Sequence, residues 1–419
     1  MIQAPKGTKD ILPNQIAAWQ QLEEQFLQTA SLFGFQEIRV PTFEQTELFQ
    51  RGVGDTTDVV QKEMYTFLDK GGRSMTLRPE ITASVVRAYL EHGLSSTPSP
   101  QKFCYRHTAF RYEKMGKGRY REFNQFGCEV FGAQSPTTEA EMIAMLFEFF
   151  KRLGLQKITL KINSIGCPAC RPAYLQVLRD YLRPHLSEMC EDCVRRFEKN
   201  PMRSLDCKQE RCQKIVANAP LQSDYLCAEC EQHFTELKSE LDAMGIPYEH
   251  DPFIVRGLDY YTKTVFEFVS ENVGTQGTIC GGGRYDGLVA EMGGNHTPAV
   301  GFALGVERLL MELEAQGVEL KQAPTTDLYL VAFNETKLDA LKLASDLRKR
   351  DIRVENDLMG RSFKAQMKYA NKTGAKFLLV LGEDEVKTGN AKLKCMQDGN
   401  EHNIELTDSE SIARRIING

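Results

Sequence analysis

The sequence predicts an α+β protein with a mostly antiparallel sheet in its main domain, a helical inserted domain, and a C-terminal α/β domain. Strand-like segments recur at irregular spacing with few crossover helices between them, which favours antiparallel pairing. Eight of the twelve cysteines fall within one polar, helical stretch, which sets that stretch apart. After residue 325, buried strands and helices alternate, which is typical of a small α/β domain.

The main domain is predicted to open with a helix over 16–33, where apolar residues recur at helical spacing and Gly34 follows as a stop signal. Residues 35–40 alternate like a strand and end at Pro41. The remaining predicted strands of this domain are 73–78, 103–112, 121–131, 157–162, 264–269 and 278–281.

Four segments organise the chain. Residues 1–166 form the first part of the main domain, 167–250 the cysteine-rich helical insertion, 251–322 the second part, and 325–419 the C-terminal domain. Within the last segment we predict the following elements: a strand at 328–332, a helix at 336–350, a strand at 352–354, a helix at 361–372 and a strand at 376–381.

Composition is that of an ordinary globular protein, with 42% hydrophobic and 26% charged residues in a chain of 419. No stretch approaches the ~20 apolar residues that span a bilayer, and the first residues lack the apolar run of a signal peptide. We therefore expect a cytoplasmic protein with no membrane partner. The net charge of −5 neither indicates nor excludes an RNA partner, because RNA requires only a local basic surface.

A basic hairpin is predicted around Phe110-Arg111-Tyr112-Glu113, with a glycine-containing loop that leads to Arg119. An arginine on a strand has a fixed position, and its planar fork grips a phosphate or carboxylate with two hydrogen bonds. The alternative is a solvated cationic hairpin of a common kind. Taken alone, the segment leaves both interpretations open.

A second segment, residues 301–309, predicts a small-residue strand that runs into a helix bearing Arg308. Gly301 and Gly305 permit close backbone approach, which suits a flat ligand. A helix N-terminus beside an arginine favours an anion. The alternative is a tight strand–helix junction with an ordinary surface arginine, which is the more frequent case for such a segment by itself.

Together these two segments resemble motifs 2 and 3 of the class II aminoacyl-tRNA synthetases, and residues 35–49 around Pro41 would be motif 1. Residues 255–262 (VRGLDYYT) and 280–288 (CGGGRYDGL) resemble the two histidine-specific motifs of the bacterial histidyl-tRNA synthetase family, and 76–82 (TLRPEIT) completes the set. The resemblance covers essentially the whole chain. It implies a class II catalytic domain, an anticodon-binding C-terminal domain, a homodimer formed through motif 1, and L-histidine, ATP with Mg²⁺, and tRNA(His) as substrates.

The same resemblance implies a histidine pocket. A neutral imidazole has one N–H donor and one acceptor nitrogen, so its pocket needs an acceptor and a hydroxyl at fixed separation. Gln125 and Glu129 lie four residues apart on a predicted strand and therefore share one face. For Tyr260, Tyr261 and Tyr285, each taken alone, the alternative is packing in the hydrophobic core. The implied histidine-binding residues are Glu80, Thr82, Arg111, Gln125, Glu129, Arg256, Tyr260, Tyr261 and Tyr285.

For ATP, the resemblance implies that Arg111 holds the α-phosphate and the reacting carboxylate, while Arg119 and Arg308 hold the outer phosphates and Glu113 belongs to the same site. Arg256 would approach the α-phosphate from the opposite side, and it and Arg111 are the expected catalytic residues. The reaction is an in-line displacement in which the protein positions the reactants and stabilises charge.

Two features depart from the family pattern. Ile81 stands where a glycine is expected after the Pro-Glu pair, and a bulky β-branched residue there could alter the pocket wall. The hairpin loop reads Lys114-Met115-Gly116-Lys117, whereas many relatives have a proline and a glutamine. Because that loop contacts the acceptor end of the tRNA, the contacts expected there differ.

The cysteine cluster offers candidate ligands for structural zinc, which takes four thiolates, often from two Cys-x-x-Cys pairs. The alternative is a set of packing thiols, and the family does not require metal here. Spacing does not say which pairs share an ion. Catalytic zinc is not expected, because no pair joins the ATP motifs. The eight candidates are Cys167, Cys170, Cys190, Cys193, Cys207, Cys212, Cys227 and Cys230.

Two other functions compete with tRNA charging: a synthetase-like regulatory paralogue that binds ligands without charging tRNA, and a non-catalytic RNA-binding or amino-acid-sensing module. Such paralogues usually lack the C-terminal domain and alter the arginines, yet both are intact here. In that domain the predicted helix 361–372 carries Arg361, Lys364, Lys368 and Lys372 at spacings that share one face. This stripe is either an RNA-binding surface or a solvated face.

Overall fold

The computed structural model describes residues 1–54, 57–272, 277–322 and 326–418. It divides into two compact units, Met1–Lys321 and Gln322–Gly419. The boundary predicted between the segments 251–322 and 325–419 falls on Ala323, Pro324 and Thr325, which lie outside the described residues. Among the helices that are described, none is both long enough and apolar enough to cross a membrane.

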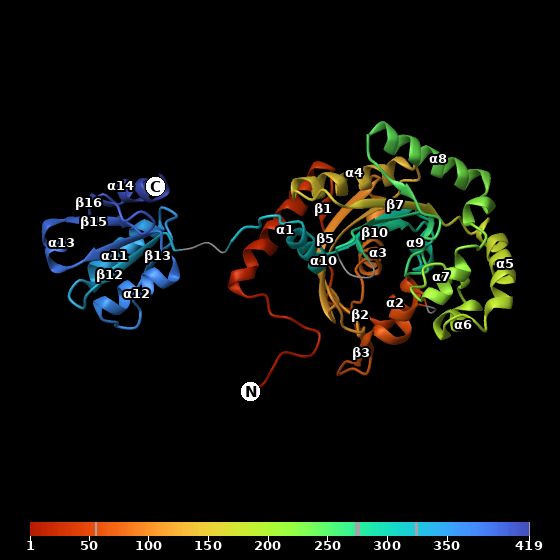
Figure 1. Cartoon of the computed structure of the whole chain (residues 1–419), viewed down its shortest axis with the longest axis horizontal. Coiled ribbons are helices and arrows are strands. Elements are labelled where there is room, and N and C mark those ends of the chain that lie inside the picture. The colour runs from red at the N-terminus through yellow and green to blue at the C-terminus, as the bar shows by residue number, and fades with distance from the viewer. Residues whose placement is uncertain (55–56, 273–276, 323–325, 419) are drawn as a thin grey trace. The chain divides into compact units, whose positions relative to one another are not determined.

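Unit 1 is built on an eight-stranded sheet in the order β1-β5-β6-β11-β10-β9-β7-β8 (Figure 1). Strands β5, β6, β11, β10, β9 and β7 pair antiparallel, and only the short outer strands β1 and β8 join in parallel. The expected mostly antiparallel sheet is confirmed. Its strands are β1 Gln36–Glu37, β5 Gln101–Phe110, β6 Glu122–Phe131, β11 Ala299–Gly305, β10 Thr278–Arg284, β9 Thr262–Val269, β7 Thr159–Ser164 and β8 Glu249–His250.

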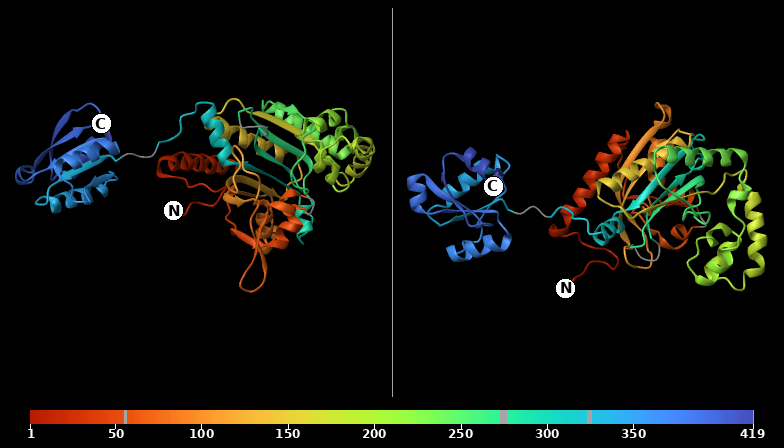
Figure 2. Two further views of the ribbon diagram at one scale, coloured as in Figure 1. Left: turned by 60° about the horizontal axis from the view of Figure 1, so that its bottom comes forward. Right: turned by 45° about the horizontal axis from the view of Figure 1, so that its top comes forward.

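Alternation along the strands gives the sheet two faces, and helices of unit 1 lie against the sheet (Figure 2). On β6, Phe126, Cys128 and Val130 join one apolar core, which α1, α4, α8 and α10 cover. The other face carries Gln125, Glu129 and the polar residues of the candidate site, and α3 packs over it. These helices span Pro13–Leu32 (α1), Thr137–Arg152 (α4), Ala228–Ala243 (α8), Val306–Ala315 (α10) and Thr82–Glu91 (α3).

The cysteine-rich insertion is helical, as expected, and lies beside β7 in unit 1 (Figure 1). Its helices are α5 Arg171–Leu182, α6 Glu191–Phe197, α7 Glu210–Val216 and α8. A small three-stranded sheet precedes it in the chain: β2 Phe43–Gln45, β4 Ser74–Leu77 and β3 Tyr65–Leu68, with the helix α2 Thr46–Val53 beside them. The short helix α9 Leu288–Glu291 follows β10.

Unit 2 is a five-stranded sheet in the order β13-β12-β14-β15-β16, parallel at β13-β12-β14 and antiparallel beyond. The predicted α/β domain is confirmed. Its strands are β12 Leu328–Ala332, β13 Val354–Asn356, β14 Phe377–Leu381, β15 Asn390–Cys395 and β16 Glu401–Glu405, and its helices are α11 Lys337–Arg348, α12 Phe363–Thr373, α13 Glu383–Thr388 and α14 Ser409–Asn418.

The structure differs from two local predictions, the extent of one strand and the place of Arg361 on a helix. The strand expected over 35–40 is only Gln36–Glu37, because distant side chains take its later backbone groups. The N–H of Val40 donates to His107 Nε2 at 3.1 Å, and the carbonyl oxygens of Val40 and Pro41 each accept from Arg78 at 2.8 Å. In unit 2, α12 begins at Phe363, so Arg361 precedes the helix and instead pairs with Asp357 at 2.8 Å.

The register of the large sheet predicts a sharp difference between two glycines of β11. A Cβ on Gly301 would lie 1.6 Å from Oε2 of the buried Glu129, whereas one on Gly305 meets nothing nearer than 3.9 Å. We therefore expect Gly301→Ala to lower the free energy of unfolding by roughly 1–3 kcal/mol, as overpacking does. Gly305→Ala is the matched control on the same strand. Urea unfolding measures both, and equal stabilities would contradict the register.

Candidate active site

A buried carboxylate, that of Glu129, is the centre of the candidate site. Its side chain is fully buried and accepts hydrogen bonds from three hydroxyl groups. Thr82 and Tyr105 donate to Oε1 at 2.7 and 3.1 Å, and Tyr285 donates to Oε2. Burial raises the pKa of Glu129 to about 8, although the Tyr285 and Thr82 hydroxyls oppose the shift. Oε2 keeps an acceptor position for a further donor.

Glu80 lies next to this centre but has another task. Its Oε2 and Oε1 accept the backbone N–H groups of Thr82 and Ala83, both at 2.8 Å. These are unpaired donors of the first turn of α3, so Glu80 fixes the start of that helix and thereby the position of Thr82. Burial raises the pKa of Glu80, and these hydrogen bonds and nearby Arg111 act against the rise. Ile81, the departure from the family pattern, lies between Glu80 and Thr82 in the sequence, and its side chain is buried.

Three tyrosine rings wall the site. The ring centroids of Tyr260 and Tyr261 lie 4.6 Å apart, and Tyr285 meets Tyr260 edge-on at 5.4 Å. Burial raises the pKa of all three hydroxyls, so they stay neutral. The structure thus brings together Thr82, Glu129 and the three tyrosines, which the sequence had placed far apart. Gln125 lies on the same strand face as Glu129, and its buried Oε1 has no hydrogen-bond partner among the described residues.

Arg256 is held against the glycines of β10. A Cβ on Gly281 would come within 2.4 Å of its Nη2, so only glycine leaves room for the guanidinium. Arg256 pairs with Glu267, which also accepts from the Thr278 hydroxyl at 2.9 Å. Its pKa is raised by Glu267 despite burial, and its buried Nε has no hydrogen-bond partner within the described parts of the chain.

Arg111, Arg119 and Arg308 lie near one another, and Arg111 lies close enough to Glu80 to lower its pKa. Arg111 donates from Nε to the Pro79 carbonyl at 2.8 Å, and Arg308 donates to the Thr278 carbonyl at 2.7 Å. Arg119 faces Glu113, with 3.7 Å between Nη1 and Oε2. Burial first, and then the guanidinium groups of Arg119 and Arg111, lower the pKa of Arg308. Like charges gathered in this way favour an anion with several negative oxygens.

Sequence reasoning missed several residues of this site. Tyr105 donates to Glu129, and it lies an even number of positions before Arg111, so strand alternation could have placed it on that face. Gly127 leaves room for it, because a Cβ there would lie 2.3 Å from the tyrosine oxygen. Arg78 is buried and ties Val40 and Pro41 to the Thr108 carbonyl, a role with no local sequence signal.

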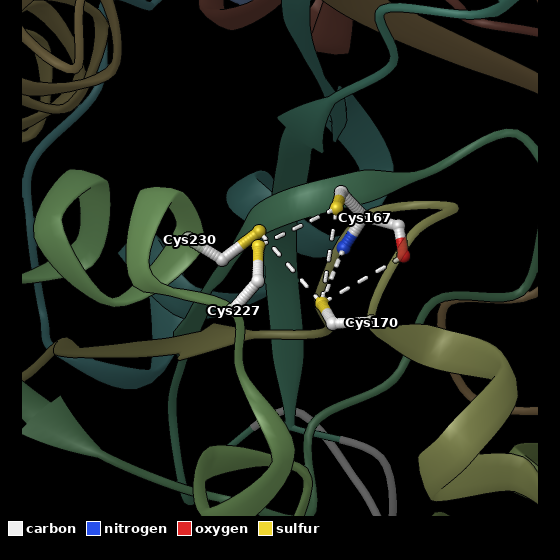
Figure 3. Close-up of side chains that lie close together, drawn as sticks. All are labelled: Cys167, Cys170, Cys227 and Cys230. Atoms are coloured by element: carbon white, nitrogen blue, oxygen red, sulfur yellow. Dashed lines mark hydrogen bonds between the residues drawn. The ribbon is translucent and has the colours of Figure 1, made fainter.

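The eight insertion cysteines lie outside this site and form two groups of four thiols. In one group, Cys167 lies 3.8 Å from both Cys170 and Cys227, measured between sulfur atoms, and Cys170 lies 3.9 Å from Cys230 (Figure 3). The other group is Cys190, Cys193, Cys207 and Cys212. All eight are free thiols able to hold a metal ion.

Comparison with known proteins shows the family of the chain. The family model for histidyl-tRNA synthetase matches residues 7–309, and that for the anticodon binding domain matches 312–415. The histidine–tRNA ligase of Acetivibrio thermocellus is 56% identical over 97% of this chain and 98% of its own length. That of Clostridium botulinum strain 657 is 51% identical over 99% of each chain.

A solved structure, apo histidyl-tRNA synthetase of S. aureus, aligns with a TM-score of 0.84 at 40% identity and covers 99% of this chain and 100% of its own. The family model spans most of unit 1, and the relatives match nearly end to end at more than half identity. This chain belongs to the histidyl-tRNA synthetase family.

Proposed function

We propose that this chain is a histidine–tRNA ligase, which activates L-histidine with ATP to histidyl-adenylate and pyrophosphate and then transfers histidine to the 3′ end of tRNA(His). The observation that carries the proposal is the buried Glu129 carboxylate, which three hydroxyl groups orient, together with the gathering of Arg111, Arg119 and Arg308. One half of the site fits a small polar molecule with N–H donors. The other half fits polyphosphate.

We infer that histidine lies among the tyrosine rings and donates an N–H to the remaining acceptor position of Glu129. Thr82, Tyr260, Tyr261 and Tyr285 complete its surroundings, and the unpaired Gln125 Oε1 offers a second acceptor. Glu80 contributes chiefly by holding the start of α3, because both its oxygens already accept backbone N–H groups. Each Glu80 oxygen has a further lone pair, so Glu80 can also accept a hydrogen bond from histidine directly.

Activation is an in-line displacement. The histidine carboxylate oxygen attacks the α-phosphorus, the bond to the pyrophosphate oxygen breaks, and pyrophosphate carries away the charge. We propose that Arg111 and Arg256 stabilise the α-phosphate from opposite sides, and that Arg119 and Arg308, with Glu113, hold the outer phosphates. Arg256 suits this role because Glu267 and the Gly281 backbone fix it before ATP arrives.

The Mg²⁺ that accompanies ATP would neutralise charge on the phosphates. Carboxylate oxygens are its preferred protein ligands. Glu63 and Glu113 are carboxylates that lie near each other and near Arg111 and Arg119: burial raises the pKa of Glu63, Arg111 lowers it, and the negative charge of Glu113 raises it further. We propose these two residues as the protein side of the Mg²⁺ site.

Unit 2 is proposed to bind the anticodon. The exposed lysines of α12, Lys364, Lys368 and Lys372, recur at every fourth residue and follow one helical face. Arg361 does not belong to this stripe, since it pairs with Asp357 and stacks on Tyr369, with 4.3 Å between its guanidinium carbon and the ring centroid. Single-stranded anticodon bases are the usual target of sequence-specific RNA recognition.

We further propose a homodimer through the motif 1 region, acting in the cytoplasm, where clustered thiols stay reduced. The small sheet there presents apolar side chains to solvent: Phe43, Phe67 and Leu68 are 51%, 43% and 71% exposed. The ring centroids of the two phenylalanines lie 6.2 Å apart. An exposed apolar patch of this kind marks an interaction surface.

The insertion thiols are proposed ligands of structural, not catalytic, zinc.

The test of the proposal is ATP–pyrophosphate exchange screened over all twenty amino acids. Histidine alone should support exchange, because a site built around hydrogen bonds rejects molecules that lack the matching groups by ~10⁴ or more. Ligand binding without histidine-dependent exchange would favour the regulatory paralogue. Equal exchange with another amino acid would overturn the assignment.

The raised pKa of Glu129 predicts a pH dependence. In the free protein the carboxyl is mostly neutral below pH about 8, whereas a histidine N–H donor prefers the carboxylate. The KM for histidine should therefore fall as pH rises from about 7 toward 8, by up to roughly tenfold per unit. Glu129→Gln cannot ionise, so its KM should be about ten- to a hundredfold higher and lack this fall. Both proteins share the titration of histidine itself, and identical profiles would contradict the prediction.

Removal of unit 2 should separate the two half-reactions. A chain ending at Ala323 keeps unit 1 and is expected to retain histidine-dependent exchange while losing most tRNA charging. In the full chain, replacing Lys364, Lys368 and Lys372 with alanine should weaken charging in a salt-dependent way if the α12 face contacts phosphates. Undiminished charging by the truncated chain would exclude an anticodon role for unit 2.

A further inference from the structure

The insertion holds two separate clusters of four thiols. The first cluster is Cys167, Cys170, Cys227 and Cys230, and the second is Cys190, Cys193, Cys207 and Cys212; within each, all ligand atoms lie within 4.8 Å of one another. The first cluster joins the beginning of the insertion to its last helix, since it combines the residues just after β7 with the start of α8. The second cluster lies between these two segments in the sequence.

The sulfur spacings match a tetrahedral metal site. A zinc ion with four thiolates at about 2.3 Å requires sulfur–sulfur distances of about 3.8 Å. The observed distances are 3.8, 3.8 and 3.9 Å in the first cluster and 3.7 Å between Cys190 and Cys207 in the second. A disulfide would require about 2.05 Å. Packing thiols have no reason to gather in two groups of four at this spacing.

Backbone groups around the sulfurs add to the match. The N–H groups of Cys167 and Cys190 point at Cys170 Sγ and Cys212 Sγ, both at 3.2 Å. Donors of this kind orient thiolate ligands around a metal. Figure 3 shows the four sulfurs of the first cluster converging on one point from the loop after β7 and from the first turn of α8.

Each cluster fixes residues that hold the segment 256–261. Between Cys193 and Cys207 of the second cluster, Arg203 donates to the Arg256 carbonyl at 2.6 Å and Asn200 donates to Asp259 Oδ1 at 2.9 Å. Beside the first cluster, Arg171 follows Cys170 and donates to the Tyr261 carbonyl at 2.7 Å.

The first cluster has a second tie to the same region. Lys263, two residues after Tyr261, pairs with Glu229 at 2.7 Å, and Glu229 lies between the cluster residues Cys227 and Cys230. The backbone N–H of Lys263 also donates to the carbonyl of Gly166, the residue before Cys167, at 2.8 Å. The segment 256–261 is thus held at both ends by residues adjacent to the thiol clusters.

We propose that the chain binds two zinc ions, one in each four-thiol cluster, and that they act as positioning elements for the segment 256–261 and so set the affinity for histidine. The second half of this statement rests on the proposed function, in which Tyr260 and Tyr261 surround histidine and Arg256 stabilises the α-phosphate. The metal assignment stands independently of it. Arg171 and Arg203 are the positioning residues that connect metal to pocket.

The metal assignment is tested by counting zinc in the full chain purified without chelator. The reduced protein should carry two ions. Cys167→Ser with Cys227→Ser should remove one, Cys193→Ser with Cys207→Ser should remove the other, and the crossed pair Cys167→Ser with Cys193→Ser should remove both. Cys395→Ser, a cysteine of unit 2 outside both clusters, is the control and should keep two. Loss of one ion from the crossed pair would overturn the grouping.

Wild-type protein tests the same point without any variant. Cobalt added to the metal-stripped chain should give the intense absorption of tetrahedral thiolate coordination and saturate at two equivalents. No zinc in the purified chain together with no cobalt binding would overturn the sites.

The positioning role is tested by kinetics. Arg203→Ala should keep both zinc ions yet raise the KM for histidine by about tenfold or more, the usual size of effects from groups that orient a site. The KM for ATP should rise less, because the segment 256–261 contributes two residues to the histidine pocket and only Arg256 to the phosphates. Arg183→Ala, an exposed arginine of the same insertion, is the control. Unchanged histidine KM in Arg203→Ala and in both single-cluster variants would overturn the positioning role. Absence of any histidine-dependent exchange in the wild type would sink the proposed function and leave the metal count untouched.

Discussion

A carboxylate buried at the centre of an antiparallel sheet is the constraint on which the arrangement of unit 1 depends. An unpaired charge in such a place costs several kcal/mol, so donors must be supplied. The hydroxyls on Glu129 come from the start of α3, from β5 and from the residue after β10. Space for it comes from Gly301 on β11. A one-residue slip of β6 against β11 would turn Glu129 to the opposite face of the sheet, away from these donors.

The two halves of the site deviate from ordinary ionisation in ways that a ligand would reverse. The pKa of Glu129 is raised by burial, and that of Arg308 is lowered by burial and by neighbouring guanidinium groups. Both shifts disfavour the charged form in the free protein. A positively polarised donor at Glu129 favours its charged form again, and phosphate oxygens do the same for Arg308. Binding of amino acid and nucleotide therefore favours the charged forms of Glu129 and Arg308, which burial disfavours in the free protein.

Local pattern predicted those elements whose partners do not alter the backbone. The strand over 328–332 matches β12, and the strand over 103–112 matches β5 within two residues, because alternation and apolar runs are local signals. The strand predicted over 35–40 is shorter in the structure, because Arg78 and His107, which lie far along the chain, form hydrogen bonds with the backbone at its end. The grouping of cysteines was equally out of reach, since it requires the start of α8 to return to the loop after β7. Glu80 and Glu129 looked alike in sequence, and only the fold shows that one fixes a helix start while the other is ringed by hydroxyls.

The order of strands in the large sheet has a consequence for how the chain emerges from a ribosome. Val130 of β6 pairs with Val300 of β11, 170 residues later, and the whole cysteine-rich insertion is made in between. At usual elongation rates that interval is roughly ten to thirty seconds. Throughout it, the β5–β6 hairpin has one long edge without its neighbour, and Glu129 lacks Tyr285. The nascent chain therefore carries an open sheet edge and an incompletely paired acid, a natural binding target for chaperones that capture extended segments during synthesis.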